Sequence, residues 1–151
     1  MMQDLTEFEG PMVTWPRVAA VAYAEEALAE LRETWTLALA TNAAASEEKD
    51  IWAALHRVGL DRHLDKVYCF RGIGHQKPSP EFFEHILEDL GMERSRVLMV
   101  GDSFERDVLG ANRCGIRAIW LNEKTEEARE GEMYRTIHSL RSLPRAIETI
   151  G

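Results

Sequence analysis

Short apolar runs alternate with amphipathic segments along most of this chain, and this alternation limits its possible folds more than any other feature. Residues with the length and character of a buried strand occupy 36–41, 66–70, 96–100, 117–121 and 136–140. Helical periodicity occupies 23–33, 46–58, 80–90, 104–114 and the segment from about 142 onwards. Strands that alternate with helices at this spacing form parallel sheets. We therefore predict an α/β fold, a three-layer Rossmann-like parallel sheet with helices on both faces.

Length and composition are those of a globular protein. The chain has 151 residues, of which 45% are hydrophobic and 29% charged, which is enough to build one hydrophobic core. We predict a single domain over residues 1–151. Residues 1–16 are polar and contain the breakers Gly10, Pro11 and Pro16, so we expect an irregular N-terminal arm there.

Charge and cysteine content exclude several function classes. A net charge of −8 argues against a nucleic-acid surface, which needs a concentrated basic face. No apolar run is long enough for a membrane span, and the N-terminus has no signal-peptide pattern. Cys69 and Cys114 lack metal-ligand spacing and are too few for a disulfide framework. We expect a cytoplasmic protein with two buried thiols that binds neither nucleic acid nor membranes.

Polar side chains follow three successive strands of the predicted sheet. Thr41 and Asn42 end one strand, Lys77 lies in the loop after the next, and Asp102 ends the third, with Asp107 in the following helix. The carboxyl ends of parallel strands share one edge of a sheet, where ligands bind. Magnesium often uses only one or two protein carboxylates, and lysine suits a phosphate neighbour. These residues together predict a magnesium-assisted phosphate site.

Each of these residues also has a structural interpretation. Asp107 could serve the helix dipole, Thr41 a turn, and Lys77 a solvated surface. Only the ordered set at successive strand ends favours a functional site. His75 lies in the Lys77 loop and could reach a substrate, whereas His85 falls inside a helix and is expected to pack or to lie on the surface.

Three segments resemble motifs of the haloacid dehalogenase superfamily, whose members are mostly magnesium-dependent phosphatases. The segments LALATNA (37–43), KPSPEFF (77–83) and VGDSFERDVLGA (100–111) look like its second, third and fourth motifs, in the family's order. The resemblance covers roughly residues 16 to 125. It implies that Thr41 binds the transferring phosphoryl group and that Lys77 neutralises charge around it. It also implies that Asp102 ligates magnesium, while Asp107 supports the metal shell or anchors Lys77.

The family's nucleophile, an aspartate in a first motif D-x-D-x-T or V, has no good match here. In MQDLT (2–6), Asp4 and Thr6 fill the third and fifth places, but Met2 stands where the nucleophile belongs. A thioether cannot form the aspartyl-phosphate of this chemistry. We interpret Asp4 as a solvated arm carboxylate.

The resemblance places the missing strand in the middle of the sheet, where an empty slot would expose unpaired backbone edges. Residues 17–23 could replace it, although the resemblance makes them the lead-in to the first helix. A second copy of the chain could also supply the strand, as a strand-exchanged homodimer. We favour a third explanation, that the natural gene product begins upstream and this chain is truncated.

The resemblance therefore implies a hydrolase of small phosphorylated substrates that uses Mg²⁺ and has no sizeable cap, because the intervals between motifs leave no room for one. The alternative is a noncatalytic phosphate- or metal-binding module that lost the nucleophile. A receiver domain is disfavoured because its carboxylates precede its hydroxyl and lysine, the reverse of the order here. A dinucleotide domain is weaker still, since GIG (72–74) lacks a third glycine and does not open a helix.

Overall fold

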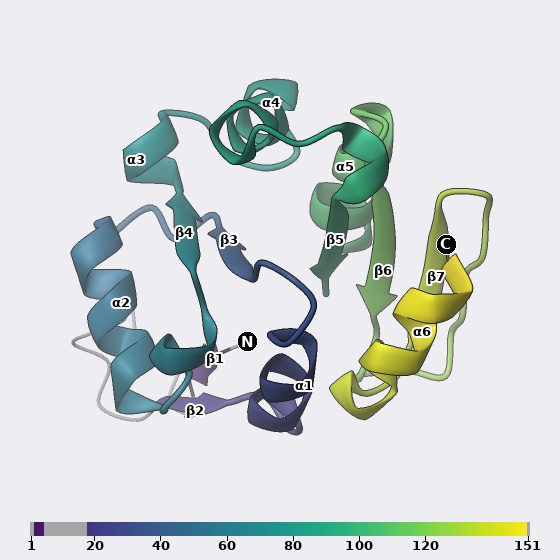
Figure 1. Cartoon of the computed structure of the whole chain (residues 1–151), viewed down its shortest axis with the longest axis horizontal. Coiled ribbons are helices and arrows are strands. Elements are labelled where there is room, and N and C mark those ends of the chain that lie inside the picture. Colours follow the sequence, from purple (N-terminus) through teal and green to yellow (C-terminus); the bar gives the residue numbers. More distant parts are fainter. Residues whose placement is uncertain (1, 5–17, 151) are drawn as a thin grey trace. The chain divides into compact units, whose positions relative to one another are not determined.

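The computed structural model describes residues 2–4 and 18–150, which form two compact units, Met1–Gly74 and His75–Gly151. Figure 1 shows the helices and strands of the chain, coloured along the sequence. The single domain predicted over 1–151 stays a prediction. No helix in the described part of the chain has the length and apolar character needed to cross a membrane.

The first unit is built on two parallel strands. Strand β3 (Ala38–Thr41) pairs with β4 (Lys66–Cys69), and Thr41 lies opposite Cys69 in this register. Helices α1 (Ala24–Leu31) and α2 (Glu48–Arg57) bury apolar stripes, and a 3₁₀ turn, η2 (Asp61–His63), precedes β4. The short helix α3 (Phe70–Ile73) continues directly from the end of β4 (Figure 1).

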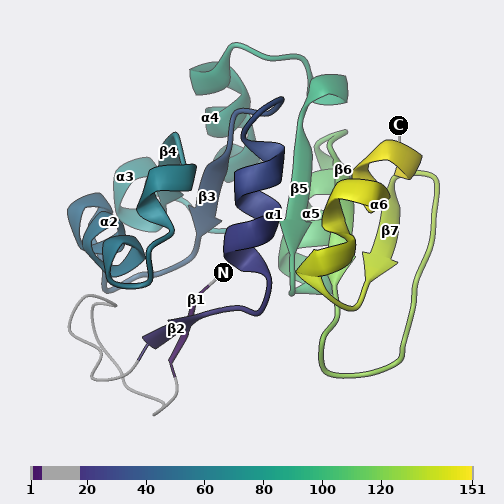
Figure 2. The same cartoon turned by 60° about the horizontal axis from the view of Figure 1, so that its bottom comes forward.

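A small antiparallel ladder precedes α1. Strand β1 (Met2–Asp4) pairs with β2 (Val18–Ala20), and β2 leads by a short turn into α1 (Figure 2). The irregular arm predicted for residues 1–16 is therefore wrong at residues 2–4, because cross-strand pairing overrides their polar composition. Residues 5–16 lie outside the described residues. Residues 18–20 pair with β1 and not with β3 or β5, so they do not act as the replacement strand.

The second unit contains a three-stranded parallel sheet in the order β5-β6-β7. Its strands are β5 (Leu98–Gly101), β6 (Arg117–Leu121) and β7 (Tyr134–Ile137), with Gly101 opposite Trp120. The helices are α4 (Pro80–Leu90), a π-helical segment η4 (Phe104–Leu109), α5 (Gly110–Arg113) and α6 (Leu143–Ile150), with 3₁₀ turns η3 (Arg94–Arg96) and η5 (Leu140–Ser142). Helix α6 packs against β7 (Figure 2).

Most predicted elements are found close to their expected bounds. The strand 117–121 and the helix 80–90 match residue for residue, while the strand expected at 136–140 lies two to three residues earlier. The helix expected to open at Ser46 begins at Glu48, because Glu47 is its N-cap and its backbone N–H donates to Asp50. The helix expected at 104–114 divides into η4 and α5.

The strands that end at the predicted site are less buried than expected. Residues 36–41 were predicted to form a buried strand, but Ala38 is exposed and the rest of β3 is half-buried; β5 is half-buried throughout. Among the described residues, β3 pairs only with β4, and β5 only with β6. The absence of a first-motif strand from this chain stays a prediction.

Candidate active site

The second unit brings Lys77 and Asp107 into direct contact. Lys77 Nζ lies 2.7 Å from Asp107 Oδ1, and the two side chains are only 10% and 5% exposed. Lys77 comes from the loop before α4, and its peptide bond to Pro78 is cis. Asp107 comes from η4, which follows α4 in the sequence. The ion pair has no net charge, and the contact with Asp107 fixes the position of the Lys77 ammonium at this loop.

The turn after β5 determines where the Asp107 carboxylate lies. Its Oδ2 accepts a hydrogen bond from the backbone N–H of Ser103 (3.1 Å). A Cβ added to Gly101 would collide with this carboxylate, so only glycine leaves room for it at the end of β5. Both Asp107 oxygens therefore have protein partners, which favours the role of anchoring Lys77 over that of direct metal ligand.

A widened helical turn begins at the same place. Ser103 O accepts from Asp107 N (2.9 Å) and from Val108 N (3.4 Å), the second bond being the long π-type one. The Ser103 side chain accepts from Arg106 N and caps the turn. Such π segments are frequent at functional sites. Here the wide turn separates Asp102 at its entry from Asp107 in its interior.

Asp102 is held by its backbone and leaves its side chain available. Its carbonyl accepts a hydrogen bond from the Trp120 indole Nε1–H (3.0 Å), because Trp120 lies beside Gly101 on the neighbouring strand. Asp102 is exposed, and its carboxylate has no hydrogen-bond or ion-pair partner within the described residues. An exposed, unpaired carboxylate at a fixed position suits a hard divalent cation.

An aromatic cluster supports this turn. The Phe104 ring packs edge-on against Trp120 and Tyr134, with ring centroids 5.2 and 5.4 Å away. The Arg129 guanidinium lies over Phe104, 4.3 Å from its centroid, and over Trp120 at 5.2 Å. These contacts stabilise both ends of the Asp102 turn. Sequence reasoning missed them because they depend on which strands are neighbours.

Thr41 and Asn42 lie in the first unit, at the carboxyl end of β3. Thr41 Oγ1 accepts from the Ala43 backbone N–H (3.2 Å), so the hydroxyl at least fixes the turn that follows the strand. Both residues are half-buried. Their position beside Lys77 and Asp102 stays a prediction.

The described residues contain no cluster of three or more His, Cys, Asp or Glu that could hold a metal on its own. His75 and His85 are both exposed, which confirms a surface position for His85.

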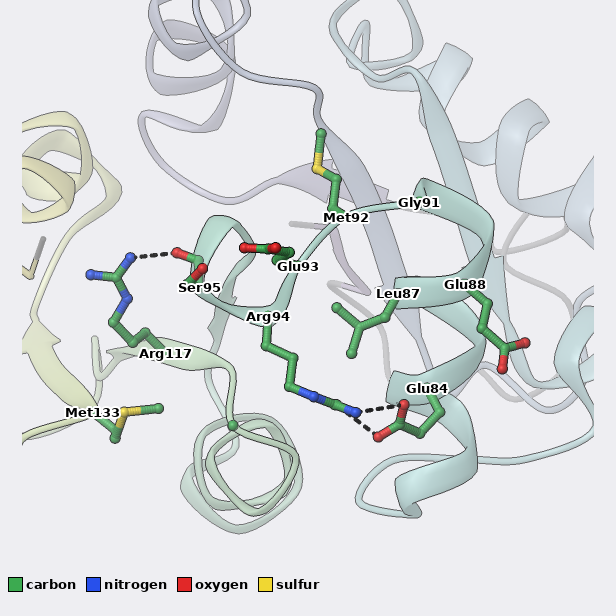
Figure 3. Close-up of a pocket in the computed structure, with 11 residues that line it drawn as sticks. Glu84, Leu87, Glu88, Gly91, Met92, Glu93, Arg94, Ser95, Arg117 and Met133 are labelled. Carbon is green, nitrogen blue, oxygen red and sulfur yellow. Dashed lines mark hydrogen bonds and ion pairs between the residues drawn. The ribbon is translucent and has the colours of Figure 1, made fainter.

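A cavity in the second unit lies away from the predicted site residues of that unit. It has a volume of about 900 Å³ and is lined by the end of α4 and by residues just before β5, β6 and β7 (Figure 3). The ion pair of Arg94 with Glu84 forms one of its walls, and Arg117 donates to Ser95 O on another. These are the amino ends of the strands. None of the predicted site residues lines this cavity.

The model of the haloacid dehalogenase-like hydrolase family matches residues 5–121. The chain therefore belongs to this family, and the resemblance found in the three motifs is confirmed. Its α/β fold is confirmed as well by a solved structure of an uncharacterized protein from Listeria monocytogenes serotype 4b. That structure has a TM-score of 0.83 and 27% sequence identity, and the match covers 94% of this chain and 86% of that one.

Among the curated relatives, one is named a phosphatase and another a nucleotidase. A ribulose-1,5-bisphosphate 5-phosphatase from Halopiger xanaduensis is 31% identical over 135 residues, which cover 89% of this chain and 55% of the relative. The pyrimidine 5'-nucleotidase YjjG from Escherichia coli is 41% identical over 78 residues, or 51% of this chain and 35% of the relative. The chain thus spans about a third to a half of the length of these proteins.

Proposed function

We propose that this protein is a magnesium-dependent phosphomonoester hydrolase that acts on a small phosphorylated substrate. The observation that carries the proposal is the buried Lys77–Asp107 pair, formed next to the turn that presents the unpaired carboxylate of Asp102. A fixed ammonium and a free carboxylate at strand ends are what a phosphate and its cation require.

The proposed roles follow from these contacts. Lys77, held by Asp107, neutralises charge on the phosphoryl group. Asp102 ligates Mg²⁺. Asp107 supports the metal shell indirectly, through its contacts with Lys77 and with the Ser103 backbone. Thr41 and Asn42 bind phosphoryl oxygens from the end of β3. Magnesium, when bound, supplies Lewis-acid stabilisation of the phosphate. Support for this class of substrate comes from the names of the two curated relatives.

The alternative proposal is a noncatalytic module that binds phosphate and metal. The observation that favours it is the sequence MQDLT, in which Met2 stands at the place of the nucleophile and Asp4 two positions after it. The first proposal includes a longer natural gene product, in which an upstream segment supplies the missing strand and aspartate.

Phosphate release separates the two proposals. The phosphatase, assayed with the upstream segment that carries the nucleophilic aspartate, should release phosphate from p-nitrophenyl phosphate with added Mg²⁺, stop after chelation and resume when Mg²⁺ is restored. The module should bind Mg²⁺ and orthophosphate with no turnover. Fusion of a strand ending in D-x-D-x-T to the N-terminus would then produce turnover only if the other site residues are competent.

We also propose that the protein works in the cytoplasm, and that a strand-exchanged homodimer is one route to a complete sheet. Support for a reducing compartment comes from the two cysteines, Cys69 and Cys114, which are buried and free. Burial raises the pKa of the Cys114 thiol and makes it a poor nucleophile. Sedimentation velocity measures the oligomeric state directly.

A further inference from the structure

A second cavity lies beside the end of β3, entirely within the first unit. It has a volume of about 610 Å³ and is lined by the segment after β3 and by α3 with the glycines that follow it. Thr41 and Cys69 are opposite each other, so the chain leaves both strands at the same edge, and Phe70 follows Cys69 directly. The cavity therefore adjoins the position proposed for the phosphoryl group and has the size of a small-molecule site.

One wall of this cavity carries a guanidinium with unused donors. Arg71 Nε donates to Ala44 O (3.0 Å), and both residues line the cavity. Its Nη1 lies 4.0 Å from Glu47 Oε1, at the limit of an ion pair, and its side chain is 53% exposed. Arg71 makes no other hydrogen bond within the described residues. The remaining N–H groups suit a planar, doubly accepting anion such as a carboxylate.

The opposite charge comes from the start of α2. Glu47 has two cations close to its carboxylate: Lys49 Nζ lies 3.2 Å from Oε2, and Arg71 Nη1 lies 4.0 Å from Oε1. Within the described part of the chain, the Glu48 side chain has no cation partner and accepts one long hydrogen bond, from Trp52 Nε1 (3.4 Å). Because Lys49 balances Glu47, a simple anion in this cavity would be attracted by Arg71 and repelled by Glu48. A group that carries both charges would satisfy Arg71 and Glu48 together.

We propose that this cavity binds the organic part of the substrate and that this part is an amino-acid-like zwitterion. Arg71 binds its carboxylate, Glu48 binds its ammonium, and the exposed side of the Phe70 ring covers its carbon chain. The inference rests on the proposed function, because it assumes that the ester's phosphate lies at the end of β3. It narrows the substrate class to phosphorylated amino acids and close analogues.

Binding calorimetry with Mg²⁺ present tests this inference without requiring turnover. The probes are O-phosphoserine (both charges), phosphoglycolate (carboxylate only), phosphoethanolamine (ammonium only), ethyl phosphate (neither) and orthophosphate. We expect O-phosphoserine to bind about tenfold more tightly than ethyl phosphate. Arg71→Met should remove most of that gain for O-phosphoserine and weaken phosphoglycolate, while leaving phosphoethanolamine unchanged. Glu48→Gln should weaken O-phosphoserine and phosphoethanolamine but not phosphoglycolate.

Controls separate specificity from folding. Arg71→Lys keeps the charge and should restore part of the affinity. Arg57→Met makes the same change at an exposed arginine of α2 that does not line the cavity, and it should alter no probe. Equal affinity for O-phosphoserine and ethyl phosphate, with orthophosphate still bound, would overturn this inference and leave the proposed function standing. Failure of orthophosphate and of every ester to bind would overturn both.

Discussion

Lys77 Nζ and Asp107 Oδ1 lie 2.7 Å apart although thirty residues separate them, and neither side chain is more than 10% exposed. Removing one partner leaves an uncompensated buried charge. Lys77→Met and Asp107→Asn should each lower the free energy of unfolding by about 3 kcal/mol. The double variant should lose clearly less than the sum of the two. Urea unfolding of the four proteins measures this, and strict additivity would show that the pair contributes no coupling.

Gly101 is the residue that gives the Asp107 carboxylate its space, because a Cβ there would overlap with it. Gly101→Ala should lower the free energy of unfolding by about 1–3 kcal/mol through overpacking, and it should weaken the Lys77–Asp107 contact. Gly72→Ala is the matched control, since its Cβ would meet only Cys69 Sγ at 3.5 Å, an ordinary contact. Equal stability of Gly101→Ala and the wild type in urea would contradict this packing.

Trp120 fixes the backbone of Asp102 through its indole N–H. Trp120→Phe keeps an aromatic ring against Phe104 but removes the donor, so the Asp102 carboxylate should lose its fixed position. The Mg²⁺ concentration for half-saturation should rise about tenfold, as for other residues that orient a ligand. Trp35→Phe, at an exposed tryptophan of the other unit, should leave it unchanged. An unchanged Mg²⁺ affinity in Trp120→Phe would show that Trp120 does not position Asp102 for metal binding.

The ion pair of Glu84 with Arg94 should make stability depend on acid. Hydrogen bonds from Arg94 hold the pKa of Glu84 below its usual value of 4.5. The Glu84 carboxylate therefore binds a proton less readily in the folded state than in the unfolded state. Its stabilisation is complete above the pKa that Glu84 has in the unfolded state, and it is lost as the pH falls through the pKa that Glu84 has in the folded state. The melting temperature of Glu84→Gln should be lower than that of the wild type at neutral pH, and the difference should shrink below about pH 4.5.

Both side chains of this ion pair are partly exposed, so the difference in melting temperature is expected to be small. Glu88→Gln is the control, one turn further along α4, at a carboxylate with no ion-pair partner in the described residues. A difference that stays constant from neutral to acid pH would show that the ion pair does not contribute.

The parallel strands and the principal helices could be predicted from sequence because periodicity and turn residues are local signals. RAIWL at 117–121 and the helix from Pro80 to Leu90 carry both, and the structure has them at those residues. The π turn at 104–109 carries no such signal, since its bonds to Ser103 O differ from α-helical ones by only one residue of spacing. The ladder of residues 2–4 with 18–20 depends on pairing across a long interval, which composition does not encode.

For the candidate site, the charged residues could be proposed from sequence and stay a prediction, whereas the contacts that hold them could not be predicted. Lys77, Asp102 and Asp107 were identified by their order at strand ends. A side chain at position 101 would collide with the Asp107 carboxylate, which only the folded structure shows. The hydrogen bond from Trp120 to the Asp102 carbonyl likewise depends on the observed register of β5 with β6. Arg71 gave no signal at all, because an exposed arginine after a strand has no distinctive pattern.

Calorimetric titration of Mg²⁺ in the presence of orthophosphate tests the central claim most directly, that Asp102 anchors a magnesium-assisted phosphate site. The comparison needs wild type, Asp102→Asn and Glu105→Gln, the last being a neutralised exposed carboxylate three residues away. We predict that the wild type and Glu105→Gln bind Mg²⁺ with the same affinity, that orthophosphate tightens it, and that Asp102→Asn loses at least tenfold. Equal Mg²⁺ binding by Asp102→Asn and the wild type would contradict the account.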